Sequence, residues 1–95
     1  MNEGKARDAV IRADKAEALL RNELLNEAFE YLEAQFYEAW QSSAVSDADN
    51  REQIYQLSQN LKALRGYFQT VIDTGKMAQS QLDEIKRRST FNKIR

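Results

Sequence analysis

The sequence contains no cysteine, no histidine and no proline. Without cysteine or histidine the chain can form no disulfide framework, no thiolate or imidazole zinc site, no Ser/His/Asp triad and no cysteine nucleophile. Carboxylates remain as ligands for hard cations. No nucleophile paired with a base and no phosphate-binding loop is visible, so we expect a protein that is not an enzyme and holds no cofactor. Without proline, nothing in the sequence forces a long helix to end.

The sequence also lacks a long apolar run. No stretch approaches the roughly 20 apolar residues that cross a bilayer. The opening residues Met1 to Gly4 lack the basic region and apolar core of a signal peptide. We therefore expect a soluble, intracellular protein with no membrane partner and no small-molecule substrate.

The net charge is only −1, but the charges are unevenly distributed. Residues 1–47 carry five Lys/Arg and ten Asp/Glu, whereas residues 48–95 carry nine Lys/Arg and five Asp/Glu. This asymmetry favours antiparallel helix pairing or head-to-tail contacts more than it favours a nucleic-acid partner.

The clearest pattern is a heptad seam between residues 54 and 85. Apolar or small residues recur there in alternating steps of three and four, which predicts one side of a single long helix. Such a seam requires cover from another helix, so we interpret it as the self-association seam of the protein. Its positions are Ile54, Leu57, Leu61, Leu64, Phe68, Val71, Gly75, Ala78, Leu82 and Ile85.

The seam belongs to the second of two predicted helices. The first should run from about residue 5 to about residue 42, because this stretch is rich in strong helix formers and carries two adjacent apolar stripes. A turn is expected at residues 43–46, and Ser46 with Asp49 fits a capping box that starts the second helix near residue 47. That helix should end near residue 88, followed by a frayed basic tail at residues 89–95.

A turn this short makes the two helices antiparallel neighbours. The predicted fold is therefore an all-α antiparallel hairpin of two long helices, coiled-coil-like, forming a single domain over residues 1–95. At its open end Gly75 and Ala78 should face Ala13 and Ala16, so the helices can approach closely. A hairpin has no third layer, so the remaining apolar side chains favour a homo-oligomer, either a four-helix bundle or a larger assembly. The uncovered side chains are Leu19, Tyr31, Tyr37, Tyr55, Tyr67, Ile72 and Met77.

Two charged segments are candidate contact sites. The acidic stretch of the first helix could hold a metal ion or dock a basic partner, but a solvated helix face explains it better because no histidine accompanies it. The basic C-terminal residues could contact nucleic acid or an acidic protein, although a helix dipole also favours bases there. The acidic residues are Glu23, Glu27, Glu30, Glu33 and Glu38, and the basic residues are Lys86, Arg87, Arg88, Lys93 and Arg95.

Two glycines and the aromatic residues have structural explanations. The segment Asp73-Thr74-Gly75-Lys76 lacks the full phosphate-loop pattern, and close helix packing accounts for Gly75. Gly66 lies off the seam, where either a kink or a close intersubunit contact would explain it. The aromatic residues could form a stacking platform for bases, but their helical spacing favours core and interface positions. They are Phe29, Tyr31, Phe36, Tyr37, Trp40, Tyr55, Tyr67 and Phe68.

Two stretches resemble small all-helical proteins that tailed bacteriophages encode near their head and packaging genes. These are Asn22-Glu23-Leu24-Leu25-Asn26-Glu27-Ala28-Phe29-Glu30-Tyr31-Leu32-Glu33, continuing to Tyr37-Glu38-Ala39-Trp40, and Tyr67-Phe68-Gln69-Thr70-Val71-Ile72-Asp73-Thr74-Gly75-Lys76. The resemblance implies a role in virion assembly or DNA packaging, in the virion or the host cytoplasm. Small terminase subunits and scaffolding proteins likewise use oligomerising helical hairpins and basic segments.

The sequence thus favours a non-enzymatic phage structural, assembly or packaging-associated protein that acts by oligomerisation and protein–protein contacts. Two alternatives remain open. One is a nucleic-acid-binding accessory protein that uses the basic tail. The other is a phage inhibitor that binds a host protein through the acidic face of the first helix.

Overall fold

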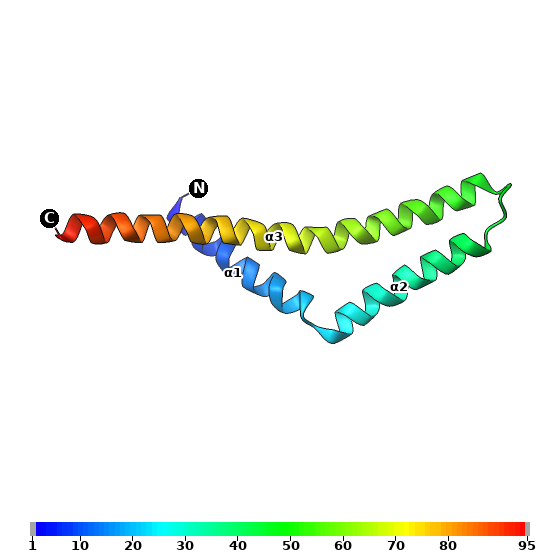
Figure 1. Ribbon diagram of the computed structural model, residues 1–95, viewed down its shortest axis with the longest axis horizontal. Coiled ribbons are helices and arrows are strands. Elements are labelled where there is room, and N and C mark those ends of the chain that lie inside the picture. Colours follow the sequence, from blue (N-terminus) through cyan, green and yellow to red (C-terminus); the bar gives the residue numbers. More distant parts are fainter. Residues whose placement is uncertain (1, 95) are drawn as a thin grey trace. The chain divides into compact units, whose positions relative to one another are not determined.

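The computed structural model describes the backbone of residues 2–94 and the side chains of residues 2–90. Every regular element in this part of the chain is an α-helix (Figure 1). The helices are α1 (Glu3–Leu20), α2 (Glu23–Ser42) and α3 (Ala48–Ile94). The predicted all-α class and the turn after residue 42 are confirmed, but the chain is not a simple two-helix hairpin.

The first predicted helix is interrupted at Arg21 and Asn22, so the prediction of one continuous helix over residues 5–42 was wrong. Asn22 has an extended backbone, with φ −72° and ψ 121°, and its side-chain oxygen accepts a hydrogen bond from the Leu25 backbone N–H at 2.9 Å. The side chain of Asn26 donates to the Leu20 carbonyl at 2.8 Å. Asparagine side chains thus satisfy one terminal group on each side of the break, in place of helical hydrogen bonds.

The helix α3 contains 47 residues and continues to Ile94, so the prediction that it ends near residue 88 was wrong. It begins after Asp47, whose carboxylate accepts a hydrogen bond from the Asn50 backbone N–H at 3.3 Å. Nothing after Gly75 breaks the helix, because no further glycine and no proline follows. Residues 89–94 are therefore helical rather than frayed, and Arg95 lies outside the described residues.

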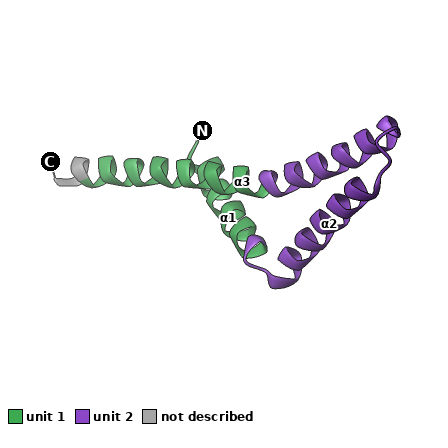
Figure 2. Cartoon of the chain, turned by 45° about the vertical axis from the view of Figure 1, so that its right-hand side comes forward, with its two compact units in different colours: residues 1–19, 68–95 green, residues 20–67 purple. Residues whose placement is uncertain are grey.

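The chain forms two compact units (Figure 2). Unit 1 consists of Met1–Leu19 and Phe68–Arg95, so in it α1 packs on the C-terminal half of α3. The two helices approach closely at Gly75, where a Cβ atom would lie 2.1 Å from the Cβ of Ala13 and 3.1 Å from the Ala9 carbonyl oxygen. The close packing expected of Gly75 is confirmed. Among the side chains that the structure describes in unit 1, the buried ones are small apart from one isoleucine: Ala6, Ala13, Ala16, Ile72 and Ala78.

Unit 2 consists of Leu20–Tyr67, and in it α2 packs on the first half of α3. Phe29 and Leu61 are its buried apolar side chains. The connection between the helices is held at Ser43, whose hydroxyl donates to the Trp40 carbonyl at 2.5 Å and accepts from Arg51 Nη1 at 3.1 Å. The short turn therefore fixes the two helices side by side.

Candidate interaction surfaces

The predicted seam divides between buried and exposed positions. Leu61, Gly75 and Ala78 are buried, and Ile54, Phe68, Val71 and Leu82 are partly covered. Leu57 and Leu64 are 50% and 52% exposed, and Ile85 is 41% exposed. Ile72, which the sequence predicts to be uncovered, is buried.

In unit 2 the packed line of α3 passes through Ser58 and Arg65 instead of Leu57 and Leu64. The guanidinium of Arg65 lies 5.2 Å from the centre of the Phe29 ring, and its Nη1 is 3.1 Å from Glu33 Oε1. Arginine can cover apolar surface with its stem while its head stays solvated, so it replaces a leucine at this position. The consequence is that both leucines lie toward one flank of the helix pair.

The ion pair between Arg65 and Glu33 marks one flank of unit 2 as charged, and Lys62 lies on the same flank. The opposite flank carries no charged side chain. Seven charged residues occur in residues 23–42 and 53–67, namely five glutamates, one lysine and one arginine. At about 100° per residue, none of the seven falls within the arc of this flank, and Glu27 and Glu38 lie at its solvent-facing border. We call it the uncharged face; its members are Leu24, Leu25, Ala28, Leu32, Gln35 and Ala39 on α2, and Gln53, Leu57, Asn60, Leu64 and Tyr67 on α3.

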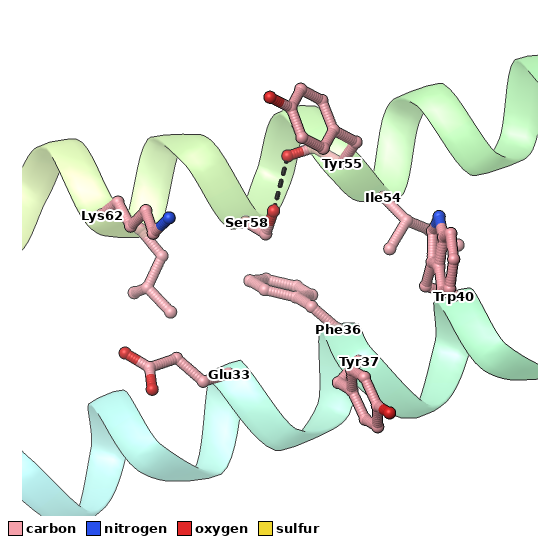
Figure 3. A pocket seen from close by; sticks show the side chains of 9 residues that line it. Glu33, Phe36, Tyr37, Trp40, Ile54, Tyr55, Ser58 and Lys62 are labelled. Carbon is pink, nitrogen blue, oxygen red and sulfur yellow. Dashed lines mark hydrogen bonds between the residues drawn. The ribbon is translucent and has the colours of Figure 1, made fainter.

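The charged flank contains a cavity of about 510 Å³ between α2 and α3 (Figure 3). Phe36 points into the space between the two helices, and Ile54 approaches from α3. The hydroxyl of Ser58 donates to the Tyr55 carbonyl at 2.7 Å. We call this cavity the aromatic groove; its lining is Glu33, Phe36, Tyr37, Trp40, Ile54, Tyr55, Ser58, Leu61 and Lys62.

Arginine already contacts the aromatic side chains of α2 in two places. The guanidinium of Arg51 lies 4.3 Å from the centre of the Trp40 ring, at one end of the groove. Arg65 stacks on Phe29 and binds Glu33 at the other end. An arginine next to an aromatic ring gains cation–π attraction, and a nearby carboxylate adds an ion pair. The surface of α2 is thus suited to binding arginine.

The acidic residues predicted as a candidate site lie along α2, which contains five glutamates and no lysine or arginine. Glu33 binds Arg65, and Glu30 lies seven residues before Tyr37, so helix geometry places it on the groove side. Among the described residues, no group of three or more carboxylates is arranged to hold a metal ion. Glu30 and Glu33 therefore lie along the groove side of α2.

The basic residues predicted as contacts lie in the last turns of α3. Lys86, Arg87 and Arg88 are exposed. Arg87 Nη2 lies 2.5 Å from one oxygen of Glu84, and Arg88 Nε lies 3.2 Å from the other. The hydrogen bond from Arg87, together with the charges of both arginines, lowers the pKa of Glu84 below its ordinary value of 4.5. The side chains of Lys93 and Arg95 lie outside the described residues.

Comparison of the chain with protein-family models, with curated proteins and with solved structures gives no match. Within the described residues, none of the helices has both the length and the apolar character needed to cross a membrane.

Proposed function

We propose that this protein is a non-enzymatic assembly protein that associates with a second copy of itself through the uncharged face of unit 2. The observation that carries the proposal is the absence of charge on a flank where large apolar side chains are exposed. In a two-fold dimer the same surface meets itself, so a charged group on it would face like charge at short distance. A surface without charge avoids this repulsion.

The dimensions of the uncharged face support a stable contact. At 1.5 Å per residue, the 20 residues of α2 are about 30 Å long, and two adjacent helices are about 20 Å wide. This gives roughly 600 Å² per copy and about 1,200 Å² in total, the lower end of the range for specific interfaces. Leu57 and Leu64 are each about half exposed, and covering half of a leucine side chain contributes about 1 kcal/mol.

The resemblance to small helical phage proteins supports a role in virion assembly or DNA packaging. Proteins of that kind act through repeated contacts between copies, and here the uncharged face supplies such a contact. The proposed oligomer is a four-helix bundle built from the two helices of unit 2 in each copy.

The test is to place one positive charge on the uncharged face. Leu57→Lys and Leu64→Lys each bring like charges together in the dimer, while in the free chain the new side chain remains in solvent. The control is Gln59→Lys, which adds the same charge at an exposed position of α3 away from this face. We expect light scattering to show monomers for both leucine variants and an oligomer for the control, with equal helicity by circular dichroism. Leucine variants that keep the wild-type mass would contradict the proposal.

A further inference from the structure

The C-terminal end of α3 extends beyond the helix that covers it. In unit 1, α1 runs antiparallel to α3, with Ala13 beside Gly75. Because α1 begins at Glu3, ten residues before Ala13, it leaves α3 uncovered from about ten residues after Gly75. Figure 1 shows α3 continuing past the start of α1. We call residues 86–94 the overhang; its described side chains, 86–90, are all exposed.

The overhang is basic and follows an exposed apolar residue. After Glu84 the sequence contains no acidic residue, and Ile85, which is 41% exposed, precedes Lys86, Arg87 and Arg88. Packing supplies most of the stability of helices in proteins, and the described side chains of the overhang are exposed. A surface that combines apolar side chains with carboxylates would complement it.

The aromatic groove of unit 2 has this combination. Its lining includes Phe36, Trp40 and Ile54, and its cavity of about 510 Å³ has room for apolar side chains. Glu33 lines the groove, Glu30 lies one turn before it, and Glu23 lies two turns further along the same side of α2, so carboxylates extend from one end of the groove, whose one basic lining residue is Lys62. The arginines at the two ends of the groove, Arg51 and Arg65, show within the chain how this surface binds guanidinium groups.

We propose that the aromatic groove receives the basic overhang of α3 from a second copy of the chain. In this contact Ile85 enters the groove, and the bases of the overhang bind the glutamates of α2. The two contributing surfaces differ, so the contact is heterologous and repeats from copy to copy as a ring or a filament. It is separate from the uncharged face and goes beyond dimerisation.

Charge reversal on each side tests this contact. The groove variant is Glu23→Arg with Glu30→Arg, and the overhang variant is Lys86→Glu with Arg87→Glu. The control is Glu27→Arg with Glu38→Arg, which makes the same change in net charge on the solvent-facing side of α2, between the groove line and the uncharged face. Sedimentation velocity at low and high salt measures the assemblies that salt dissociates, because contacts between exposed charges weaken as salt rises.

We expect each reversed variant alone to weaken this salt-sensitive association about tenfold, as reversal of two exposed ion pairs predicts. An equimolar mixture of the two should restore it, because every overhang then meets a groove of opposite charge. The control should behave as the wild type. Trp40 is the chain's single tryptophan and lies in the groove, so its fluorescence should change with the same dependence on salt and mixing.

Three results would overturn the inference: wild-type association of the reversed variants, no recovery on mixing, or equal loss in the control. If mixing fails and a DNA duplex binds the wild type but not the overhang variant, the overhang is a nucleic-acid contact instead. The variant Leu64→Lys distinguishes this contact from the proposed dimer. It places a charge on the uncharged face and so disrupts the dimer, but it leaves the groove and the overhang unchanged. Salt-sensitive assembly should persist in it.

Discussion

Gly75 lies against Ala13 so closely that the α-carbon hydrogen of the glycine occupies the space where any other residue would carry a Cβ. That atom would be 2.1 Å from the Cβ of Ala13. The backbone of α1 is also near, since the Ala9 carbonyl oxygen would be 3.1 Å away. The tight fit of α1 on α3 therefore depends on the absence of one side chain.

Gly75→Ala should destabilise the protein by about 1–3 kcal/mol, because the added methyl group forces the two helices of unit 1 apart. Gly66→Ala is the matched control, since nothing lies within 4 Å of the corresponding Cβ position. In the control, alanine should stabilise the helix by about 0.5–1 kcal/mol through its better helix propensity. Urea unfolding followed by circular dichroism measures both. Equal effects at the two positions would show that Gly75 makes no close contact.

Asn22→Ala should destabilise unit 2 by about 1 kcal/mol, because it removes the side-chain acceptor that caps α2. Gln59→Ala is the control, since Gln59 carries the same amide group at an exposed position inside α3, and its replacement should be neutral or slightly stabilising. The measurement is thermal unfolding. If Asn22→Ala has no effect, or raises the helix content, the interruption between α1 and α2 is not fixed by this cap.

Arg65 should contribute to stability through both its ion pair and its aromatic contact. Glu33→Gln removes the charge of the partner and should cost about 0.2–1 kcal/mol, as for other exposed pairs. Arg65→Met should cost more, since the guanidinium over Phe29 is lost as well. A double-mutant cycle from urea unfolding curves gives the coupling free energy between the two residues. A coupling free energy of zero would show that the ion pair contributes nothing to stability.

Glu84 should titrate below its ordinary pKa of 4.5, because Arg87 and Arg88 stabilise its charged form. Since the folded-state pKa is the lower one, this stabilisation is present above pH 4.5 and is lost as the pH falls through the lowered value. NMR titration of the Glu84 carboxyl carbon measures the midpoint. In the variant with both Arg87→Gln and Arg88→Gln, the midpoint should return toward 4.5. An unchanged midpoint in that variant would contradict the assigned cause.

Much of the fold could be predicted because the sequence patterns are periodic. Helix-forming composition indicated the all-α class, the serine-rich segment before Asp47 indicated the turn, and Gly75 at a seam position indicated the close packing. The break at Asn22 could not be predicted from periodicity, because the apolar stripes run through it without interruption. Its extended backbone and the hydrogen bond that its side chain accepts from the Leu25 N–H distinguish it from a helical residue, and neither follows from the spacing of apolar residues.

The surfaces of unit 2 were harder to predict. A heptad pattern predicts that Leu57 and Leu64 pack against α2. In the structure Ser58 and Arg65 occupy the packed line instead. The difference is one residue, or about 100° of rotation about the helix axis. The contact of Arg65 with Phe29 accompanies the packing of the second pair. The spacing of apolar residues carries no information about this contact. This rotation leaves the leucines on the uncharged face.

The most direct test of the central claim is the mass of the wild-type chain in solution, measured by light scattering at low and high salt. An interface without charges does not weaken as salt rises. The account predicts at least twice the chain mass of 11.0 kDa at high salt, and larger assemblies at low salt through the overhang. A protein that stays at 11.0 kDa at high salt, over the concentration range of the measurement, would contradict self-association through the uncharged face.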